Sequence, residues 1–470
     1  MEEKKARSTF SSLGFVLAAA GSAVGLGNLW RFPYLAAKDG GGLFILIYLV
    51  LVLSFGFALM TSEIALGRKT QKSPVAAFGE IGKTWKFVGW GATIIPALII
   101  PYYAAIGGWV CKYAFTYLTG HGRDAVDASG GFFQTAIGIT ADGSVAWQPI
   151  LWFFIFITAT FIIVYLGVEN GIEKASVILM PILLIIIIFI AGYSTFVKDE
   201  VSGRTALQGL SIYLVPNFKG LTLVKFLNIV LDAMGQMFYS LSLAMGIMIT
   251  YGSYMKKDSS MPKSINQIEL FDTGIALLAG FIMVPTVYCF LGEEGLGSAG
   301  PSLMFIALPQ VFNGMGSFGL VIGALFFVLV IFAALTSCIS LMEAVTATIM
   351  DRFNQSRKVS VIITYALALV IGLIVCLGYN KFLFEVSFAS VKGGQILDIL
   401  DWATNSFLMP IVAILTCVVV GWVWGTDKAL EEVQLNGEKF PRKPIFVVMT
   451  KYIAPVLLFI ILLNSFGLFG

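Results

Sequence analysis

The feature that most constrains this chain is a series of apolar stretches, each long enough to cross a lipid bilayer as a helix. A spanning helix needs about 20 mostly apolar residues. By this criterion there are about eleven stretches, near residues 12–37, 42–67, 87–119, 149–167, 174–197, 226–254, 266–292, 318–350, 359–378, 396–424 and 445–468. Only 12% of the 470 residues are charged, against roughly 25% in a soluble domain. The sequence therefore predicts an all-α polytopic protein of the cell membrane, with one transmembrane domain over residues 1–470.

Two of these stretches are interrupted at matching positions. The first contains Gly21-Ser-Ala-Val-Gly-Leu-Gly-Asn28, and the sixth contains Ser240-Leu-Ser-Leu-Ala-Met-Gly246. Interrupted helices at equivalent places in two halves of a chain indicate an inverted repeat with a site at the bilayer midplane. We therefore predict one five-helix repeat over about 10–197, a second over about 226–424 and an extra helix over about 445–468, with helices 1 and 6 broken.

Lysine and arginine residues concentrate in alternate connections, and this predicts the orientation. They occur before the first stretch and after the second, sixth and eighth: Lys4, Lys5, Arg7, Arg68, Lys69, Lys72, Lys83, Lys86, Lys256, Lys257, Lys263, Arg352, Arg357 and Lys358. Since cytoplasmic loops carry the excess of positive charge, we expect a cytoplasmic N-terminus and, with an odd number of spans, a C-terminus outside. Segment 293–317 has only a short apolar run, so we expect a re-entrant or capping hairpin there.

The first interruption has the chemistry to hold a cation beside an anion. Gly21, Gly25 and Gly27 loosen the helix because they lack a side chain. Unwinding frees carbonyl oxygens, which suit a hard cation, and exposes N–H groups at the start of the next half-helix, which attract a carboxylate. Non-helical backbone at membrane depth is tolerated only around a protein-lined cavity. The spacing alone leaves a second interpretation open, in which the small residues only allow close helix packing.

Polar residues inside the other apolar stretches are further candidates. Thr336 and Ser337 put adjacent hydroxyls in the eighth stretch, where they either line a cavity or bond back to the preceding helical turn. Ionisable residues within a span are costly and are functional candidates for that reason; they are Arg31, Glu63, Asp232, Asp272, Glu343 and Asp401. Asp272 is expected either to join a cation site or to cap a helix end. Glu63 and Glu343 either serve transport or accept hydrogen bonds from unwound backbone.

One long motif carries a resemblance to a known family. Gly21-Ser-Ala-Val-Gly-Leu-Gly-Asn-Leu-Trp-Arg-Phe-Pro-Tyr34 resembles the neurotransmitter:sodium symporter family, in particular bacterial amino-acid members such as the bacterial leucine transporter. Further matches cover essentially the whole chain: Gly40-Gly-Gly42, Glu63-Ile-Ala-Leu-Gly-Arg68, Gln236-Met-Phe-Tyr-Ser-Leu-Ser242, Thr250-Tyr-Gly-Ser-Tyr254 and Leu335-Thr-Ser337.

The resemblance implies two sodium sites and no organic cofactor. The first site would be formed by the substrate carboxylate with Ala23, Asn28, Ser240 and Asp272. The second would combine the carbonyls of Gly21, Val24 and Ala333 with the hydroxyls of Thr336 and Ser337. Animal relatives use a chloride near the first sodium, whereas chloride-independent bacterial relatives carry a carboxylate in that region. Asp272, or Glu63 nearby, would play that part, which implies chloride-independent transport.

The resemblance also implies that the substrate is a neutral amino acid. Monoamine transporters of the family have an aspartate where this chain has Gly25, and the glycine leaves room for a substrate that brings its own carboxylate. The expected substrate-binding residues include no charged side chain: Ser22, Ala23, Gly25, Leu26, Gly27, Ile99, Tyr103, Tyr239, Ser240, Ser242, Ala244, Met245 and Leu341. Ala244 is expected to narrow the pocket, whereas the flexible Met245 widens its tolerance. A hydrophobic amino acid fits such a pocket best.

Sodium-coupled import by alternating access requires a gate on each side. The resemblance implies Arg31 and Asp401 as the gate on the outer side, with Tyr103 and Tyr239 as an aromatic lid. It implies Arg7, Asp351 and Tyr254 as the gate on the inner side. Gly171 and Pro181 have nine residues between them, a spacing that resembles the family's motif for partial unwinding of the fifth helix. The alternative is a simple kink at the proline.

Other classes of function fit the sequence less well. An intramembrane hydrolase needs a nucleophile with a base, or a metal site. The single histidine, His121, lies in a loop, and no HExxH or Gly-x-Ser-x-Gly motif occurs, so we do not expect an enzyme. A sodium-dependent substrate-binding sensor or a channel-like protein of the same fold remains an alternative. No basic run suggests a nucleic-acid partner, and the five cysteines (Cys111, Cys289, Cys338, Cys376 and Cys417) are expected to be buried thiols.

Overall fold

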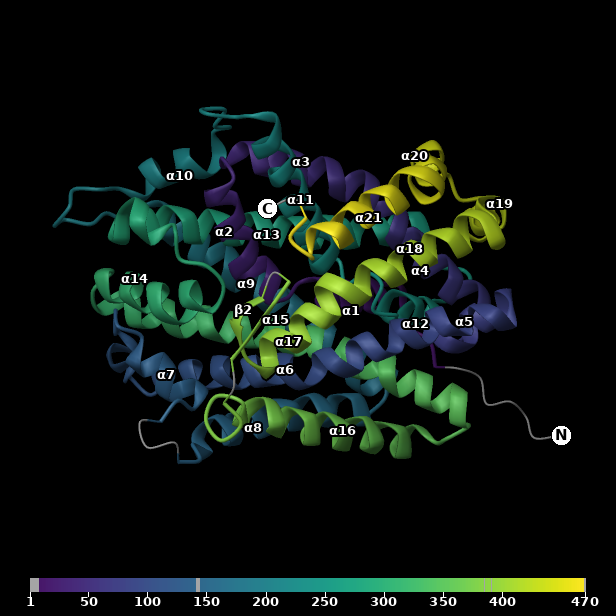
Figure 1. Cartoon of the computed structure of the whole chain (residues 1–470), viewed down its shortest axis with the longest axis horizontal. Coiled ribbons are helices and arrows are strands. Elements are labelled where there is room, and N and C mark those ends of the chain that lie inside the picture. The colour runs from purple at the N-terminus through teal and green to yellow at the C-terminus, as the bar shows by residue number, and fades with distance from the viewer. Residues whose placement is uncertain (1–7, 141–143, 384, 390, 469–470) are drawn as a thin grey trace.

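The long helices lie side by side in one elongated bundle. The computed structural model describes residues 8–140, 144–383, 385–389 and 391–468. In Figure 1 the long helices run across the picture, among them α6 (Lys86–Leu118), α8 (Trp147–Tyr165) and α16 (Arg357–Leu377). Short helices gather at the two ends. One end contains α5 (Pro74–Ile81), α12 (Ile247–Tyr254) and α19 (Thr426–Val433), and we call it the α19 end. The other contains α7 (Gly131–Ile137), α10 (Ala206–Leu214) and α14 (Leu308–Gly314), and we call it the α14 end.

The helices match the apolar stretches of the sequence closely. Within the described residues, nine helices are long and apolar enough to span a membrane: Gly42–Thr70, Lys83–Leu118, Trp147–Tyr165, Val168–Thr195, Met261–Gly295, Ser317–Phe353, Arg357–Leu377, Ile396–Val423 and Lys443–Asn464. A tenth span combines Ser12–Ala23 with Gly27–Lys38 and bends by 54° at its break. The sixth predicted span is divided into α11 (Leu223–Ser240) and α12 by Leu241–Gly246. The predicted all-helical membrane fold, with helices 1 and 6 broken, is confirmed.

Several spans consist of shorter pieces joined by single 3₁₀ or π turns, labelled η. The span pieces not yet given are α1 (Ser12–Ala23), η1 (Gly27–Arg31), α2 (Phe32–Lys38), α3 (Gly42–Leu51), η2 (Val52–Gly56), α4 (Phe57–Thr70), η3 (Lys83–Trp85), η5 (Val168–Glu173), α9 (Lys174–Thr195), α13 (Met261–Gly295), α15 (Ser317–Phe353), α17 (Ile396–Asp401), η7 (Trp402–Leu408), α18 (Met409–Val418), η8 (Val419–Val423), α20 (Lys443–Val448), η10 (Met449–Ile453) and α21 (Ala454–Asn464). The connections add η4 (Gly122–Ala125), η6 (Leu303–Ala307), η9 (Leu435–Gly437), β1 (Val386–Phe388) and β2 (Val391–Gly394).

Burial separates the helices that surround the centre from those on the outside. In the most apolar part of the third span 78% of the residues are buried, against 22% in the last span. Large apolar side chains such as Ile185, Val370 and Phe459 are exposed on the outer helices, as expected for a surface that faces lipid. Any central site must therefore be built from the inner spans.

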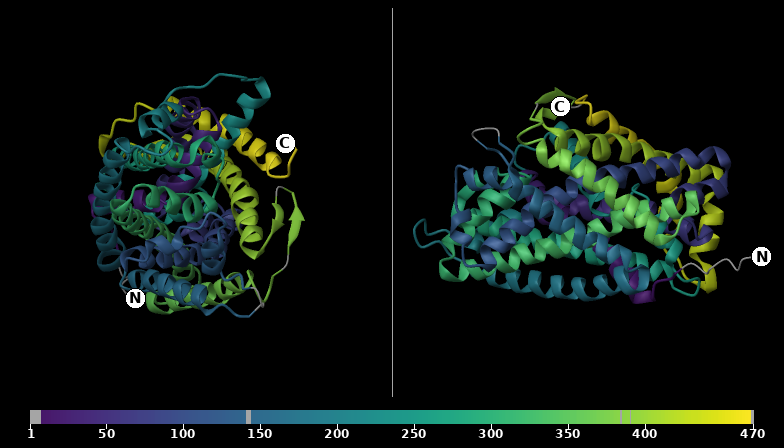
Figure 2. Two further views of the ribbon diagram at one scale, coloured as in Figure 1. Left: turned by 90° about the vertical axis from the view of Figure 1, so that its left-hand side faces the viewer. Right: turned by 90° about the horizontal axis from the view of Figure 1, so that it is seen from below.

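Segment 293–317 and the region after α16 add short elements outside the spans. As predicted, the first contains only a short apolar helix, Leu303–Gly314. Its Phe305 packs against Trp30, Trp109 and Tyr113. The antiparallel pair β1 and β2 was not predicted from the sequence and lies at the edge of the bundle (Figure 2). Its strands have only three and four residues, too few for an alternating pattern to stand out.

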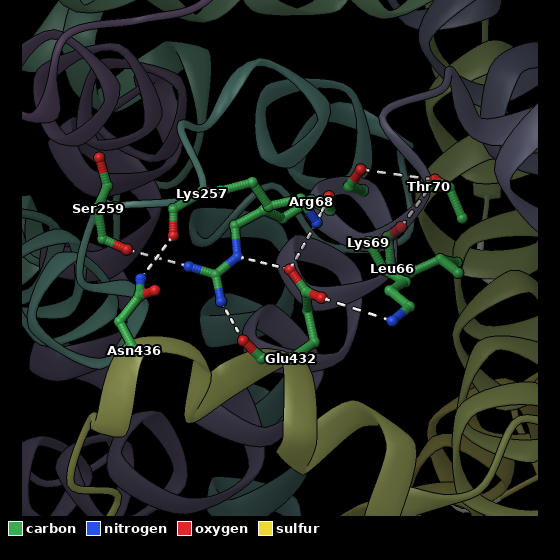
Figure 3. Close-up of polar contacts among 9 residues, drawn as sticks. Leu66, Arg68, Lys69, Thr70, Lys257, Ser259, Glu432 and Asn436 are labelled. Atoms are coloured by element: carbon green, nitrogen blue, oxygen red, sulfur yellow. Dashed lines mark hydrogen bonds and ion pairs between the residues drawn. The ribbon is translucent and has the colours of Figure 1, made fainter.

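A buried ionic cluster ties three segments together at the α19 end (Figure 3). The Arg68 side chain, at the end of α4, donates through Nε to Glu432 Oε1 of α19 at 2.9 Å and through Nη1 to the Ser259 carbonyl at 3.0 Å. Lys257 Nζ reaches the same Glu432 oxygen at 3.1 Å. Both Arg68 and Glu432 are almost fully buried, so removing one would leave an uncompensated charge. The cluster fixes the loop that follows α12.

The cysteines agree with the expectation for buried thiols. All five are free; four are buried and Cys111 is partly buried.

Candidate functional site

The two helix breaks face one another across a cavity in the centre of the bundle. The cavity is lined by Ser22, Ala23, Gly25, Leu26, Gly27, Asn28, Ile99, Tyr103, Tyr239, Ser240, Ser242, Met245, Ser337 and Leu341. These residues come from the first, third, sixth and eighth spans. The structure thus brings together the predicted substrate-binding residues, with the exception of Ala244.

On one side of the cavity the first break faces the eighth span. The α1 helix ends at Ala23, because Val24 adopts an extended conformation. Ser337 Oγ lies 3.3 Å from the Gly21 carbonyl oxygen and 3.1 Å from those of Ser22 and Val24. One hydroxyl proton cannot serve three carbonyls at once, so acceptor oxygens remain available there. A cluster of carbonyl and hydroxyl oxygens suits a hard cation.

Thr336 completes this oxygen cluster. Its Oγ1 lies 3.1 Å from the Ala333 carbonyl oxygen and 2.9 Å from that of Phe332. A Cβ atom placed on Gly21 would lie 3.1 Å from Thr336 Cβ. The glycine therefore allows α1 and α15 to approach each other closely. The five residues of the second predicted sodium site therefore lie together. Thr336 bonds back to its own helix and is not among the residues that line the cavity, whereas Ser337 lines it.

A second polar cluster lies beside the start of η1. Asn28 Nδ2 donates to Asp272 Oδ1 at 2.7 Å and to Ser240 Oγ at 2.9 Å, and Ser240 Oγ donates to Asp272 Oδ1 at 2.7 Å. The N–H of Gly25 donates to Asn28 Oδ1 at 3.0 Å. Tyr48, a residue that the sequence did not single out, places its hydroxyl 3.4 Å from Asp272 Oδ2.

Asp272 is fully buried, and within the described segments no Lys or Arg nitrogen lies within 4.0 Å of it. A buried carboxylate without a cationic partner is costly unless a cation joins it. The cluster of Asn28, Ser240 and Asp272 therefore has the charge and the oxygen atoms for a cation. Ala23 lines the cavity beside it.

The sixth break has a different geometry, which explains the position of Ala244. Ser242, Ala244 and Gly246 all have positive φ angles, of 52°, 61° and 68°. The N–H of Ala244 donates to Glu63 Oε1 at 2.7 Å, so Glu63 serves unwound backbone and does not take part in the Asp272 cluster. Ala244 is buried behind the break and not among the residues that line the cavity.

Two glycines of the first break make room for aromatic side chains. A Cβ atom on Gly25 would lie 2.9 Å from Ser337 Oγ and 3.1 Å from the Tyr103 hydroxyl oxygen. One on Gly27 would lie 2.7 Å from the Tyr239 ring. The space above Gly25 is therefore bordered by polar groups, which is where the resemblance puts a substrate carboxylate.

The chain is similar to known proteins over almost its whole length. The model of the family described as "Sodium:neurotransmitter symporter family" matches residues 7–122 and 128–469. The chain belongs to this family. An uncharacterised sodium-dependent transporter of Bacillus subtilis is 31% identical over 100% of this chain and 99% of its own length. One of Methanocaldococcus jannaschii is 33% identical over 91% of this chain and 84% of its own length.

A solved structure of a relative also superposes on the whole chain. The crystal structure of MhsT in complex with L-phenylalanine has a TM-score of 0.84 and 34% identity, and covers 98% of this chain and 100% of that one. The protein is thus a sodium-dependent transporter embedded in a membrane by several spans, and not an enzyme. Membership of this family implies that it binds sodium.

The residues expected to form the outer gate lie near the cavity without a direct ion pair. Among the described residues, none of the ion pairs within 4.0 Å joins Arg31 to Asp401. Asp401 Oδ1 instead accepts from Asn405 Nδ2 at 2.6 Å. Arg31 lies against α11, where a Cβ atom on Gly235 would be 3.4 Å from its Nη2.

At the other gate, Arg7 lies outside the described residues. Asp351 Oδ2 accepts from the N–H of Ser73 at 2.6 Å. Tyr254 donates to Glu343 Oε1 at 2.6 Å, and Arg357 donates to both oxygens of the same carboxylate. Glu343 is therefore held by side chains and not by unwound backbone. In the fifth span α9 continues through Pro181, and Gly171 lies in the preceding turn η5.

Sequence reasoning missed two residues that support the cavity. Gln236 Nε2 donates to the Gly27 carbonyl at 3.1 Å and so bridges the two broken helices. Gln236 begins the motif Gln236-Met-Phe-Tyr-Ser-Leu-Ser242, but the motif does not show which way its side chain points. Tyr48 is a single tyrosine in an apolar span, and no signal in the sequence distinguishes it from a packing residue.

Proposed function

We propose that this protein is a symporter that uses sodium to import a neutral, hydrophobic amino acid by alternating access, without a requirement for chloride. The observation that carries this proposal is the buried Asp272 carboxylate, which contacts Asn28 and Ser240 beside the cavity. The residues that line the cavity in the described part of the chain include no acidic side chain. A cation at this position would neutralise the carboxylate, and an amino acid would bring both of its charged groups with it.

The assignment of two sodium ions rests on the two oxygen clusters. One consists of Ala23, Asn28, Ser240 and Asp272, together with the substrate carboxylate. The other consists of Gly21, Val24, Ala333, Thr336 and Ser337. Since the substrate would complete the first cluster, sodium and substrate would each favour the binding of the other, and this coupling is reciprocal. Each sodium ion that moves inward gains about 2.3 kcal/mol per 100 mV of membrane potential.

The chemistry of the cavity wall supports the class of substrate. Gly25 supplies no acidic group to hold an amine. The Tyr103 hydroxyl and the N–H of Leu26, 3.5 Å apart, are proposed to bind the substrate carboxylate. Ile99, Met245 and Leu341 supply apolar contacts. The relative MhsT is known in complex with L-phenylalanine, which agrees with a large apolar side chain.

Asp272 also supports transport without chloride. Its carboxylate supplies a fixed negative charge beside the first sodium cluster, so that no mobile anion is needed to balance the cation. Arg31 with Asp401, and Arg7 with Asp351 and Tyr254, are proposed to close the two sides in turn. On this proposal the α19 end, which is rich in Lys and Arg residues, faces the cytoplasm.

Uptake into proteoliposomes tests the proposal. With an imposed inward sodium gradient, we expect accumulation of one or more of Leu, Ile, Val, Met, Phe, Tyr and Trp, and no accumulation when potassium replaces sodium. Replacing chloride by gluconate should leave the initial rate unchanged. A sensor would bind substrate without flux, and a channel would show flux that does not saturate. Lack of any sodium-dependent uptake over this panel would overturn the proposal.

A further inference from the structure

At the α14 end, two carboxyl groups meet between the two broken spans. Asp39 follows α2 directly, and Asp232 lies on α11. Lys38 Nζ and Asp232 Oδ2 form an ion pair at 2.7 Å, and both side chains are partly exposed. Asp39, in contrast, is only 6% exposed. The buried carboxyl group therefore lies beside a pair that is already balanced in charge.

Asp39 lacks a donor for one of its oxygens. Its Oδ2 atom is buried and accepts no hydrogen bond from the part of the chain that the structure describes. The Asp232 carboxyl lies within hydrogen-bonding reach of Asp39. Two carboxylates at this separation repel each other, whereas a carboxyl and a carboxylate can share a proton. One hydrogen-bond donor is therefore missing between the two carboxyl groups. A proton bound to either of them would supply that donor.

The backbone around Asp39 is held by hydrogen bonds and close contacts on both sides. The N–H of Asp39 donates to the Leu35 carbonyl at 2.8 Å, and the N–H of Asn217 donates to the Gly40 carbonyl at 3.1 Å. Gly40 and Gly41 have positive φ angles, and a Cβ atom on Gly41 would lie 2.0 Å from the Ile212 carbonyl oxygen. The backbone on both sides of Asp39 is therefore held against the segment around α10.

The charged neighbours of Asp39 come from two helices. They are Lys38 from its own helix and Asp232 and Lys225 from α11. The facing helices α3 and α10 carry no acidic or basic side chain. Where α13 meets α2 it presents Met283, Val284 and Val287, which are apolar. Burial, followed by the charge of Asp232, raises the pKa of Asp39 to about 7, against the opposing effect of Lys38.

We propose that Asp39 and Asp232 form a proton-binding site that joins the α14 ends of the first and sixth spans. With one proton bound, the two carboxyl groups and Lys38 sum to zero charge and share a hydrogen bond. Without it, two carboxylates share one ammonium group in ion-pair contact, that of Lys38, while Lys225 acts only through its more distant charge. Repulsion between the two carboxylates then favours separation of α2 from α11. Since the pKa of Asp39 is raised in this arrangement, the arrangement is favoured below pH 7 and weakened as the pH rises through that value.

Infrared difference spectroscopy of the purified full-length protein measures proton binding directly. Between about pH 5 and about pH 9, the wild type should lose a protonated-carboxyl band with a midpoint near 7, and Asp39→Asn should lack this component. Bands from other buried carboxyl groups are common to the wild type and Asp39→Asn, so they cancel when the two spectra are subtracted. The exposed Glu294 provides a control, because Glu294→Gln should keep the component. Persistence of the band in Asp39→Asn, or its absence from the wild type, would overturn the proposal.

A second variant guards against failure of Asp39→Asn to fold. Asp232→Asn removes the neighbouring charge and should lower the midpoint for Asp39 by about one pH unit. An unchanged midpoint would contradict the shared site.

The effect on transport rests on the proposed function, whereas the infrared test does not. For the wild type, the initial rate of sodium-driven uptake should change by about twofold or more when the external pH rises from about 6 to about 8. Asp39→Asn should be insensitive to pH and resemble the wild type at low pH, because the amide mimics the protonated acid. A variant with an unaltered pH profile would refute the link to transport and leave the spectroscopic result standing.

Discussion

The two breaks in the transmembrane helices interrupt the backbone in different ways. In the first, only Val24 to Leu26 separate α1 from η1, and the segment presents carbonyl oxygens to Ser337 and an N–H group to Asn28. In the second, Leu241 to Gly246 separate α11 from α12, and three residues adopt positive φ angles. The first break is a source of ligands, whereas the second is a shaped turn held by Glu63.

This difference indicates where substitutions should act. Changes around the first break should alter ion binding, because its polar atoms point toward the two clusters. Changes to the groups that hold the second turn should alter folding, because the buried N–H of Ala244 depends on Glu63.

Asp272→Asn should have the largest effect. It removes the only acidic side chain of the first cluster while keeping its shape and one oxygen that can accept from Asn28 and Ser240. The loss of a charged interaction of about 1.5–3 kcal/mol would weaken sodium binding by roughly 10- to 150-fold. The measurement is the sodium concentration that gives half-maximal uptake or thermal stabilisation. If the amide also creates a dependence on chloride, the charge of Asp272 is the reason that chloride is not needed. A sodium affinity equal to that of the wild type would remove the first cluster from the ion site.

Glu63→Ala should act on stability and not on sodium affinity. It leaves the N–H of Ala244 buried without an acceptor, at a cost of about 1–3 kcal/mol. The melting temperature of the purified protein should fall. The matched control is Glu63→Gln, which keeps an acceptor oxygen and should be much closer to the wild type. If Glu63→Ala instead changes sodium affinity at unchanged stability, the distinction between the two breaks fails.

Ser337→Ala should weaken sodium binding to a smaller extent. It removes one hydroxyl ligand from the second cluster and leaves the carbonyl oxygens, so we expect about a threefold to tenfold loss of affinity. The sodium dependence of uptake should also become less steep if this cluster holds its own ion. Ser340→Ala is a suitable control, because Ser340 lies one turn further along α15 and bonds to Tyr251. Equal effects of the two substitutions would argue for a packing role.

Ala244→Gly should have the smallest effect. The left-handed conformation at Ala244 is strained for any residue with a Cβ atom, and glycine relieves this strain. The net gain in stability should be about 1 kcal/mol or less, because glycine also increases the entropy of the unfolded chain. The range of accepted substrates should stay the same, since Ala244 does not line the cavity. A shift toward larger substrates in the uptake panel would show instead that Ala244 limits the size of the pocket.

Much of this protein is determined by its sequence alone. The apolar stretches predict the membrane helices within a few residues, because lipid demands about 20 apolar residues per span wherever the chain packs. The glycine-rich motif predicts the first break, since backbone can unwind at membrane depth only beside a cavity. The motif around Ser240 likewise predicts the second break, but not its length or its left-handed turn.

Only the tertiary structure decided which polar residues meet. Asp272 and Glu63 are both acids in apolar spans, yet one joins Asn28 and Ser240 while the other holds the N–H of Ala244. Tyr48, Gln236 and the pair of Asp39 with Asp232 carry no signal of their partners, because each contact joins segments far apart in the chain. Side-chain periodicity records which face of a helix is apolar. It does not record which neighbour that face will contact, and helix packing alone settles that question.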